Sequence, residues 1–361
     1  MALKNIVHIV NNVDKVNFGV WNAAIFGSQY LQNKYAISSF LWICTVGNEE
    51  SINKINVPSK FLGQEMKSSE ALVVLIKQSS FDIDSTLIVT HGCWGMPTKL
   101  GLHLKRLGFK WIYSPHGMLE PWSLKQKWLK KWIYFNLFER KWLGKADCIR
   151  AVSRREAGNL KKLFSSAINV IENGVEVAPL EDKSTDEELY LFMARLHQKK
   201  GILPLAQAWD KMMQGVHGKK LIIAGPDEGE LIKIRPYLKG NVEYIGPVYG
   251  DEKINLLKRA HYYILPSYSE GFPTSVVEAM SYGLIPIISE GCNFETVFNE
   301  NLGYKVEPSL DSIKSVLKEL KDKKFDKGLS FRNWQFVSNC NSEASIAEKL
   351  FKLYVDIVGS K

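Results

Sequence analysis

Two carboxylates eight residues apart stand in the part of this sequence that is richest in potential chemistry. Glu270 lies in a loop after the apolar, β-favouring segment 262–265, and Glu278 lies in a helix that the spacing of apolar residues from Val276 to Met280 predicts. A helix N-terminus offers free backbone N–H groups and a partial positive charge, which suit a phosphate. The loop carboxylate, the helix carboxylate and the free amides would therefore surround one small polar ligand.

Each of these carboxylates also has a structural interpretation. Ser275 and Glu278 have the spacing of a capping box, in which a glutamate in the first helical turn caps the helix instead of binding a ligand. Glu270 stands beside Gly271, and a loop carboxylate in that setting is often only solvated. The residues alone leave both interpretations open.

Two cations five residues apart follow another apolar strand, 189–194. Arg195 stands directly after this strand, and Lys200 precedes Gly201 and a helix that we expect to begin at Ile202. At the carboxyl end of a strand and in front of a helix, two such charges could clamp two phosphates. The alternative is that both are ordinary surface charges.

Two histidines also follow predicted strands. His91 comes after strand 87–90, and His116 comes after strand 111–113. A lone histidine is more often structural than catalytic, and we interpret His91 in that way. Glu120 lies near His116, but nothing in its spacing makes it a base.

The segment 122–144 is both aromatic and basic. An apolar stripe of Trp and Phe with Lys beside it fits a helix in the headgroup region of a membrane, where each cation adds about 1 kcal/mol on an anionic leaflet. The alternative is a core helix whose aromatic stripe packs on a sheet. Nucleic acid is not expected, because no recognised nucleic-acid motif accompanies the charge. We expect the following residues to contact a membrane or an acceptor: Trp128, Lys130, Lys131 and Trp132.

Alternating strands and helices must position these side chains. Repeated βα units predict an α/β fold with mostly parallel sheets covered on both faces, whose ligands gather at the carboxyl ends of the strands. The first unit, strand 5–10 followed by Gly19 and a helix, resembles the opening of a nucleotide-binding domain. It has no G-x-G-x-x-G pattern, which argues against a dinucleotide oxidoreductase. Gly19 is either a turn glycine or a point of close approach to a ligand.

Length and charge indicate two domains of different character. A chain of 361 residues is long for one core. The first 170 residues carry 23 Lys and Arg against 11 Asp and Glu, whereas the remainder carries 24 against 27. A basic half suits nucleic acid or an anionic membrane.

The five cysteines are scattered and have no C-x-x-C pair, which indicates a reducing compartment and argues against structural zinc. The N-terminus does not read as a signal peptide, and no apolar run approaches the roughly 20 residues of a membrane-spanning helix. We therefore expect a cytoplasmic protein.

The run from Ser269 to Ser289 resembles the E-x7-E segment of retaining, family-four glycosyltransferases. Segment 194–201 is similar to the diphosphate-binding Arg and Lys of that family, 114–122 to its His-Gly segment, and 170–176 to the turn that ends its first domain. The resemblance implies the GT-B architecture, with two Rossmann-like, parallel-sheet domains facing a central cleft. The expected division is an acceptor-side domain, 1–180, a donor-binding domain, 181–339, and a last helix, about 340–361, that packs back on the first domain.

The resemblance also assigns roles to the residues that match. Arg195 and Lys200 would neutralise the leaving diphosphate, Glu278 would hold the ribose, and Glu270 would hold the donor sugar or stabilise the developing positive charge. His116 would point toward the donor sugar and the reaction centre. Backbone contacts to the donor would come from Gly19, Gly271, Phe272, Pro273 and Thr274.

The activity implied is transfer of a sugar, with retention, from a UDP- or GDP-sugar to a saccharide or lipid-linked saccharide in the synthesis of a cell-surface polysaccharide. No cofactor, no metal ion and no nucleic acid is expected, and the protein is expected to lie on the inner face of the membrane. Two alternatives remain. One is a non-catalytic GT-B shell that binds membrane or polysaccharide, and the other is a GT-B nucleotide-sugar epimerase.

Overall fold

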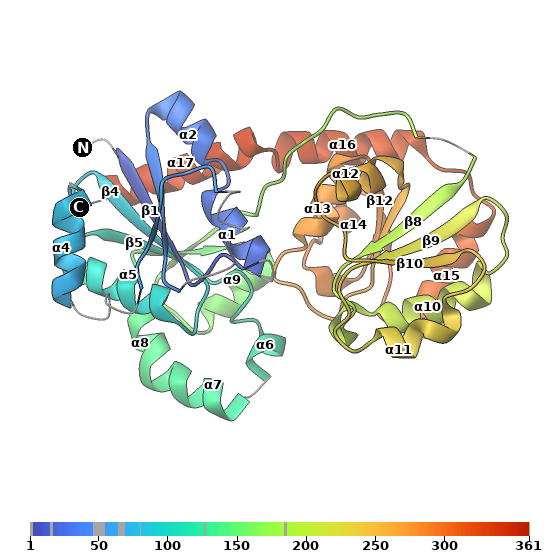
Figure 1. The fold of residues 1–361 in the computed structure, drawn as a ribbon, viewed down its shortest axis with the longest axis horizontal. Helices are drawn as coiled ribbons and strands as arrows, with labels where there is room; N and C mark the ends of the chain where they lie inside the picture. Colours follow the sequence, from blue (N-terminus) through green and yellow to red (C-terminus); the bar gives the residue numbers. More distant parts are fainter. Residues whose placement is uncertain are drawn as a thin grey trace. The chain divides into compact units, whose positions relative to one another are not determined.

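The computed structural model describes residues 3–14, 17–45, 55–63, 69–79, 81–125, 128–183 and 186–360, apart from the side chains at 69–71, 122, 125 and 130. The chain forms two compact units (Figure 1). The first unit is Met1–Gly174 together with Glu343–Lys361, and the second is Val175–Ser342. The boundary between the units therefore lies a few residues before the expected division at 180 and 181.

The first unit is built on a seven-stranded parallel sheet in the order β3-β2-β1-β4-β5-β6-β7. Every residue of β4 is buried, as expected for a parallel strand with helices on both faces. The strands are β1 (Asn5–Val10), β2 (Ser38–Ile43), β3 (Ser59–Phe61), β4 (Thr86–His91), β5 (Lys110–Ser114), β6 (Cys148–Ala151) and β7 (Ala167–Val170). The helices are α1 (Phe18–Ile25), α2 (Ser28–Tyr35), α4 (Ser69–Ser79), α5 (Met96–Arg106), α6 (Pro121–Lys125), α7 (Trp128–Tyr134), the π-helix η3 (Phe135–Glu139), α8 (Arg140–Leu143), α9 (Arg154–Lys161) and α17 (Glu343–Gly359).

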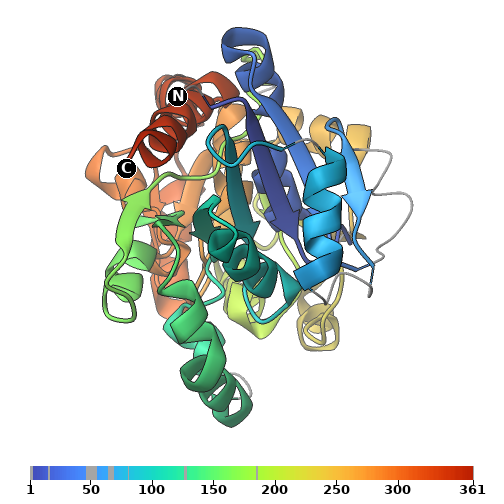
Figure 2. The same cartoon turned by 90° about the vertical axis from the view of Figure 1, so that its left-hand side faces the viewer.

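The last helix of the chain, α17, belongs to the first unit (Figures 1 and 2). Its apolar face, including Ile346 and Leu350, shares a buried cluster with Leu31 of α2. Gly27 permits this close approach, because a Cβ atom there would lie only 3.0 Å from that of Ala347. A chain end more than 300 residues away in sequence thus completes the first core.

The second unit contains a six-stranded parallel sheet in the order β10-β9-β8-β11-β12-β13. The strands are β8 (Glu188–Met193), β9 (Lys219–Ala224), β10 (Val242–Gly246), β11 (Tyr262–Leu265), β12 (Ile285–Ile288) and β13 (Tyr304–Lys305). The helices are the 3₁₀ turns η4 (Gln198–Lys200), η5 (Arg235–Tyr237) and η6 (Glu290–Cys292), with α10 (Ile202–Met212), α11 (Leu231–Ile234), α12 (Gly250–Arg259), α13 (Thr274–Ser281), α14 (Thr296–Asn299), α15 (Leu310–Lys321) and α16 (Lys327–Cys340).

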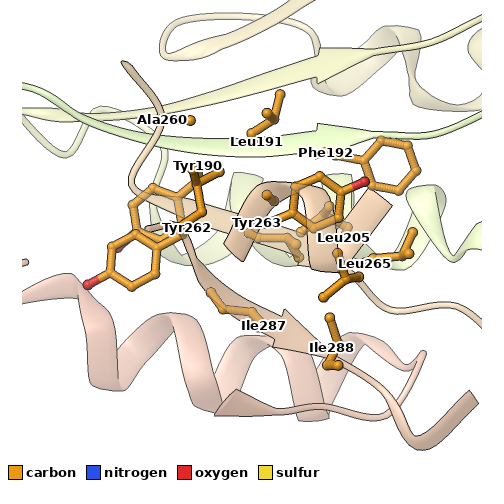
Figure 3. Packing of buried hydrophobic residues seen from close by; sticks show 14 of the residues in the cluster. Tyr190, Leu191, Phe192, Leu205, Ala260, Tyr262, Tyr263, Leu265, Ile287 and Ile288 are labelled. Atoms are coloured by element: carbon orange, nitrogen blue, oxygen red, sulfur yellow. The ribbon is translucent and has the colours of Figure 1, made fainter. Parts of the chain in front are cut away.

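Aromatic residues of β8 and β11 fill the centre of the second core (Figure 3). The rings of Tyr190 and Tyr262 stack with their centroids 4.4 Å apart. Tyr263 is fully buried and donates its hydroxyl hydrogen bond to the carbonyl of Met193, at 2.6 Å. This bond ties the end of β8 to β11, and the loops after these two strands carry the expected site.

Both sheets contain a point where the strand order reverses. It lies between β1 and β4 in the first sheet and between β8 and β11 in the second. Ligands of open parallel sheets bind outside the carboxyl ends of the strands at such a point. Among the described residues, no helix has both the length and the apolar character needed to cross a membrane.

Candidate functional site

Lys200 and Glu270 meet at the reversal point of the second sheet. The ammonium nitrogen of Lys200, after β8, lies 2.7 Å from Oε1 of Glu270, after β11, and both side chains are largely buried. The hydroxyl of Ser267 donates to the same carboxylate oxygen at 2.6 Å. Burial would raise the pKa of Glu270, but the charge of Lys200 and these two hydrogen bonds hold it below its ordinary value. Glu270 is therefore an anion at neutral pH.

Two glycines allow the loops around this ion pair to pack backbone against backbone. A Cβ atom on Gly201, where φ is +69°, would lie 2.1 Å from the carbonyl oxygen of Pro266. A Cβ atom on Gly291 would lie 2.1 Å from the carbonyl oxygen of Ser267. A side chain at either glycine would push the loop away and separate the two charges.

The loop 271–274 leads into α13. This helix begins at Thr274 with Pro273 at its N-cap, and no side chain caps it. The N–H groups of Thr274 and Val276 donate to the carbonyls of Phe272 and Pro273, so a ligand at this helix start competes with those bonds. Asn293, at a positive φ of 57°, holds the loop by donating its side-chain amide to the carbonyl of Glu270. No pattern in the sequence pointed to Asn293, because its role depends on the loop after β12 contacting the loop after β11.

Glu278 does not form the capping box that its spacing with Ser275 suggested. Since Pro273 takes the N-cap position, Glu278 falls in the second turn of α13 and not in the first. Its Oε1 lies 2.5 Å from the ammonium of Lys253 in α12, and both side chains are about one quarter exposed. The structure brings Glu278 together with Lys253, whereas Lys200 and Glu270 pair with each other.

Arg195 is paired with an acid that sequence reasoning missed. Its Nη1 donates to both oxygens of Glu228, at 2.8 and 3.0 Å, and the side chains are 50% and 33% exposed. Glu228 comes from the loop after β9, which Asp227 fixes by accepting three backbone N–H bonds. Because exposed ion pairs stabilise by only about 0–1 kcal/mol, an anionic ligand can displace Glu228 from Arg195.

In the first unit, His91 and His116 are neighbours. Nδ1 of His91 lies 2.9 Å from Nε2 of His116, and Nε2 of His91 lies 3.1 Å from Nδ1 of His8. Burial, with a smaller contribution from the Arg150 guanidinium, lowers the pKa of His8 and that of His116 to about 3. Burial likewise lowers the pKa of His91 well below its ordinary value. The sequence signal for His8 was a single polar residue inside the apolar strand β1.

The backbone at His116 has an uncommon conformation. His116 and Gly117 have φ values of +52° and +76°, a region that non-glycine residues seldom adopt. Glu156 fixes this turn, since its two oxygens accept the N–H groups of Gly117 at 2.6 Å and Val152 at 2.7 Å. Burial raises the pKa of Glu156 to about 7, against the lowering effect of these bonds.

A pocket of about 110 Å³ lies at the reversal point of the first sheet. Amides from Asn11, Asn12 and Asn17 border it, together with His91. Gly19 lies beside this region in the first turn of α1, so it is not a turn glycine, and a Cβ atom there would meet no atom within 4 Å. The lining carries no charged side chain and mixes these polar groups with apolar residues, among them Val10, Trp94 and Met118.

The segment from α6 to α8 extends from the seven-stranded sheet as an arm (Figures 1 and 2). Phe135, Glu139 and Leu143 form its buried side, and Glu139 accepts from the hydroxyl of Thr98 at 2.8 Å. The opposite side exposes large apolar residues, with Trp128 and Trp132 at 63% and 62%. The core interpretation therefore holds for one side of the arm and is wrong for the two tryptophans.

The two lysines expected on this arm are described unequally. Lys131 donates to the carbonyl of Ser123 at 2.6 Å and lies 5.6 Å from the centre of the Trp94 ring. The side chain of Lys130 lies outside the described residues. In the described part of the chain, no cluster of three or more His, Cys, Asp or Glu side chains could hold a metal ion.

Two family profiles match consecutive parts of the chain. Residues 179–330 match the profile described as glycosyl transferases group 1, and residues 48–178 match glycosyltransferase family 4. Together they cover residues 48–330, which include parts of both units.

Curated relatives act on lipid-linked saccharides. The UDP-Gal:α-D-GlcNAc-diphosphoundecaprenol α-1,3-galactosyltransferase of Escherichia coli is 26% identical over 82% of this chain and 81% of its own length. The N,N′-diacetylbacillosaminyl-diphospho-undecaprenol α-1,3-N-acetylgalactosaminyltransferase of Campylobacter jejuni is 27% identical over 55% of this chain and 52% of its own.

Solved structures share the fold. A glycosyltransferase of Rickettsia africae superposes with a TM-score of 0.75 and 16% identity, covering 100% of both chains. The Anabaena protein HepE, solved in complex with UDP and glucose, gives a TM-score of 0.74 at 13% identity, over 98% of this chain and 100% of that chain. These likenesses establish the architecture of two parallel-sheet domains.

Proposed function

The chain belongs to the family-four glycosyltransferases and has their GT-B fold, and from this premise we propose that it transfers a sugar, with retention, from a nucleotide-diphosphate sugar to a lipid-linked saccharide. The donor is a UDP- or GDP-sugar, and no metal ion takes part. The observation that carries the proposal is the buried Lys200–Glu270 pair at the reversal point of the second sheet. A cation for phosphate and an anion for hydroxyl groups stand there side by side.

The donor diphosphate binds the two cations after β8. Lys200 and Arg195 each have a carboxylate partner in this structure, and the diphosphate exchanges with those partners. The start of α13 adds the positive end of its helix dipole on the same edge of the sheet. This concentration of positive charge stabilises the leaving group electrostatically, which is the task that a metal ion performs in other transferases.

Glu270 binds the donor sugar. Its carboxylate is anionic and fixed by Ser267, so it accepts hydrogen bonds from sugar hydroxyls and favours the positive charge that develops at the anomeric carbon. The bond from that carbon to the phosphate oxygen breaks, and a bond to the acceptor oxygen forms on the same face. The departing phosphate takes the proton of the acceptor hydroxyl, so charge and atoms balance.

The acceptor assignment rests on the relatives and on the arm. The E. coli and C. jejuni relatives carry diphosphoundecaprenol-linked acceptors in their names. The exposed apolar side of the arm, with Trp128 and Trp132, supports a location at the inner membrane surface, where such acceptors are embedded. The basic charge of the first 170 residues supports an anionic leaflet as the partner surface.

The test has two stages. Purified protein is screened by thermal shift against a panel of UDP- and GDP-sugars, because a ligand that binds the folded state raises the unfolding midpoint. The donor that shifts the midpoint is then incubated with a polyprenyl-diphosphate-linked saccharide in detergent, and a lipid product one sugar longer is expected, with retained configuration by NMR. Donor turnover that needs no acceptor, or no turnover with any donor, contradicts the proposal.

A further inference from the structure

Three imidazole rings form one continuous hydrogen-bonded chain in the first unit. His8 lies within β1, His91 ends β4, and His116 follows β5, so three neighbouring strands each contribute one ring. The N···N distances are 3.1 Å from His8 to His91 and 2.9 Å from His91 to His116. Both nitrogens of the central ring are used, one for each neighbour.

When the three rings are neutral, their hydrogen bonds must all point in the same direction. A neutral imidazole carries one N–H donor and one acceptor nitrogen. His91 must therefore donate to one neighbour and accept from the other, and each outer ring must match it. Burial and the Arg150 guanidinium disfavour a positive charge on every ring. Consequently all three rings carry their proton on the same nitrogen, either Nδ1 or Nε2 throughout.

The row of three rings ends at Nδ1 of His116. Nδ1 of His116 is buried and has no partner among the described residues. The left-handed backbone of His116 and the bond from Gly117 to Glu156 fix the direction of this ring. A buried polar atom held without a partner is unfavourable, so its retention points to a ligand that completes it.

We propose that His8 and His91 are positioning residues that fix the tautomer and the orientation of His116, so that its Nδ1 is presented to a hydroxyl group of the substrate. The assignment of that hydroxyl to a sugar rests on the proposed function. The chain of hydrogen bonds does not depend on it. A hydroxyl can both donate and accept, so it completes the chain in either direction.

The first experiment measures tautomers in the full-length protein without substrate. Histidine-selective ¹⁵N labelling distinguishes a protonated from an unprotonated ring nitrogen for each of the seven histidines. The expected result at pH 7 is that His8, His91 and His116 are neutral and share one tautomer. Different protonated nitrogens among the three, or a charged ring, would overturn the proposal, and this result needs no variant to fold.

The second experiment removes the central ring. His91→Phe keeps an aromatic ring but has no hydrogen-bonding nitrogen, so it interrupts the row of hydrogen bonds and His116 is expected to become a mixture of tautomers. His91→Asn has a side-chain amide whose oxygen can accept from one outer ring while its NH2 group donates to the other, so it should restore one tautomer. The exposed His217 lies in the second unit, and His217→Asn serves as the control for assignment and stability. An unchanged His116 spectrum in His91→Phe would also overturn the proposal.

The third experiment links the chain to turnover. In His91→Phe, kcat is expected to fall about 10²-fold, the scale of a small misplacement in an active site, with the donor KM unchanged. His91→Asn should recover most of this loss. Equal losses of kcat in both variants would show that His91 contributes only through packing. If the wild-type protein shows the shared tautomer but has no transferase activity, the proposed function is contradicted. The inference that His8 and His91 fix the tautomer of His116 is not.

Discussion

The ammonium of Lys200 lies 2.7 Å from Oε1 of Glu270, so an ion pair joins the loops after β8 and β11. These strands are neighbours in the sheet but follow one another only after β9 and β10 in sequence. The pair therefore lies at the reversal point, where the proposed function places the diphosphate and the sugar of the donor. A change in either charge should affect transfer before it affects folding.

Glu270→Gln tests the carboxylate of this pair. Glutamine keeps the shape but loses the charge, so transfer is expected to fall by about 10²-fold or more, the scale of one lost charge-stabilising contact. Steady-state rates with a lipid-linked acceptor measure the effect. Glu290→Gln, a change at a carboxylate of the neighbouring turn η6 that pairs with Lys305, is the control and should keep its activity. Near-normal turnover of Glu270→Gln would remove Glu270 from the reaction.

Substitutions of Arg195 and of Glu228 should change donor affinity in opposite directions. Arg195→Ala should weaken donor binding and reduce transfer by about 10²-fold. Glu228→Gln frees Arg195 from its carboxylate, so donor binding should tighten by up to about 5-fold, because an exposed pair is worth about 1 kcal/mol at most. Calorimetric titration of the donor measures both. Glu243→Gln, which breaks the exposed pair with Lys220, should leave donor affinity unchanged.

The sequence was sufficient to predict the fold and to place Lys200 and Glu270 in loops after apolar strands, but not to predict that they pair with each other. Alternating apolar strands and helical spacing indicated parallel sheets, but Lys200 ends the turn η4 and Glu270 lies within the loop after β11, so their contact depends on β8 and β11 being adjacent. The start of α13 was predicted less well. Pro273 occupies the N-cap, which shifts Glu278 into the second turn and toward Lys253. A capping-box spacing predicts a cap only when the helix begins where the motif requires.

Residues that act through long-range contacts could not be predicted. Glu228 reaches Arg195 from another strand end, and Asn293 holds the carbonyl of Glu270 from the loop after β12. The same holds for His8, whose neighbour His91 is 83 positions away. Such contacts depend on which strands are adjacent. A sequence pattern that covers one βα unit at a time does not contain this information.

Chelation tests the expectation that no metal ion takes part. Because cationic side chains and the helix dipole neutralise the diphosphate in the proposed mechanism, dialysis against EDTA should leave the transfer rate unchanged within about 2-fold, far below the effect of one lost charge-stabilising contact. As the matched measurement, the transfer rate is determined again after Mg²⁺ or Mn²⁺ has been added to the dialysed protein. Loss of transfer that either ion restores would require a metal site in the donor complex.

Glu156 gives stability a pH dependence of known sign. Its pKa is about 7 in the folded protein against an ordinary value of 4.5, so the folded state binds the proton more tightly and loses stability as the pH rises through this window. The three histidines, whose folded pKa values lie below the ordinary 6.5, contribute the opposite sign. The difference between wild type and Glu156→Gln isolates the glutamate.

In Glu156→Gln, the free energy of unfolding should therefore rise more steeply with pH between 5 and 7 than in wild type. The difference should reach about 2–3 kcal/mol, since each pKa unit corresponds to about 1.4 kcal/mol. Urea titrations at several pH values measure it. Parallel curves for the two proteins would show that Glu156 titrates normally, and that burial does not dominate its environment.

The exposed side of the arm predicts binding to membranes. Trp128 and Trp132 lie four positions apart on α7 and are more than half exposed, with Leu129 and Leu137 beside them. Burial of one such ring in the interface contributes about 1.5–3 kcal/mol, so Trp128→Ala and Trp132→Ala should each lower the partition coefficient onto anionic vesicles by roughly 10-fold or more. Sedimentation with vesicles of phosphatidylglycerol and phosphatidylcholine measures the effect.

Charge and apolar contact can be separated in the same assay. Lys141 lies on the same arm and is exposed, so Lys141→Gln should weaken binding to anionic vesicles by about 1 kcal/mol and leave binding to neutral vesicles unchanged. Phe331→Ala removes an exposed aromatic ring from α16 in the second unit and should alter neither. If the tryptophan variants bind as wild type does, the arm does not contact the membrane. Transfer to a short, water-soluble acceptor should survive in all these variants, because none of the four positions lies at the strand ends that carry the proposed donor site.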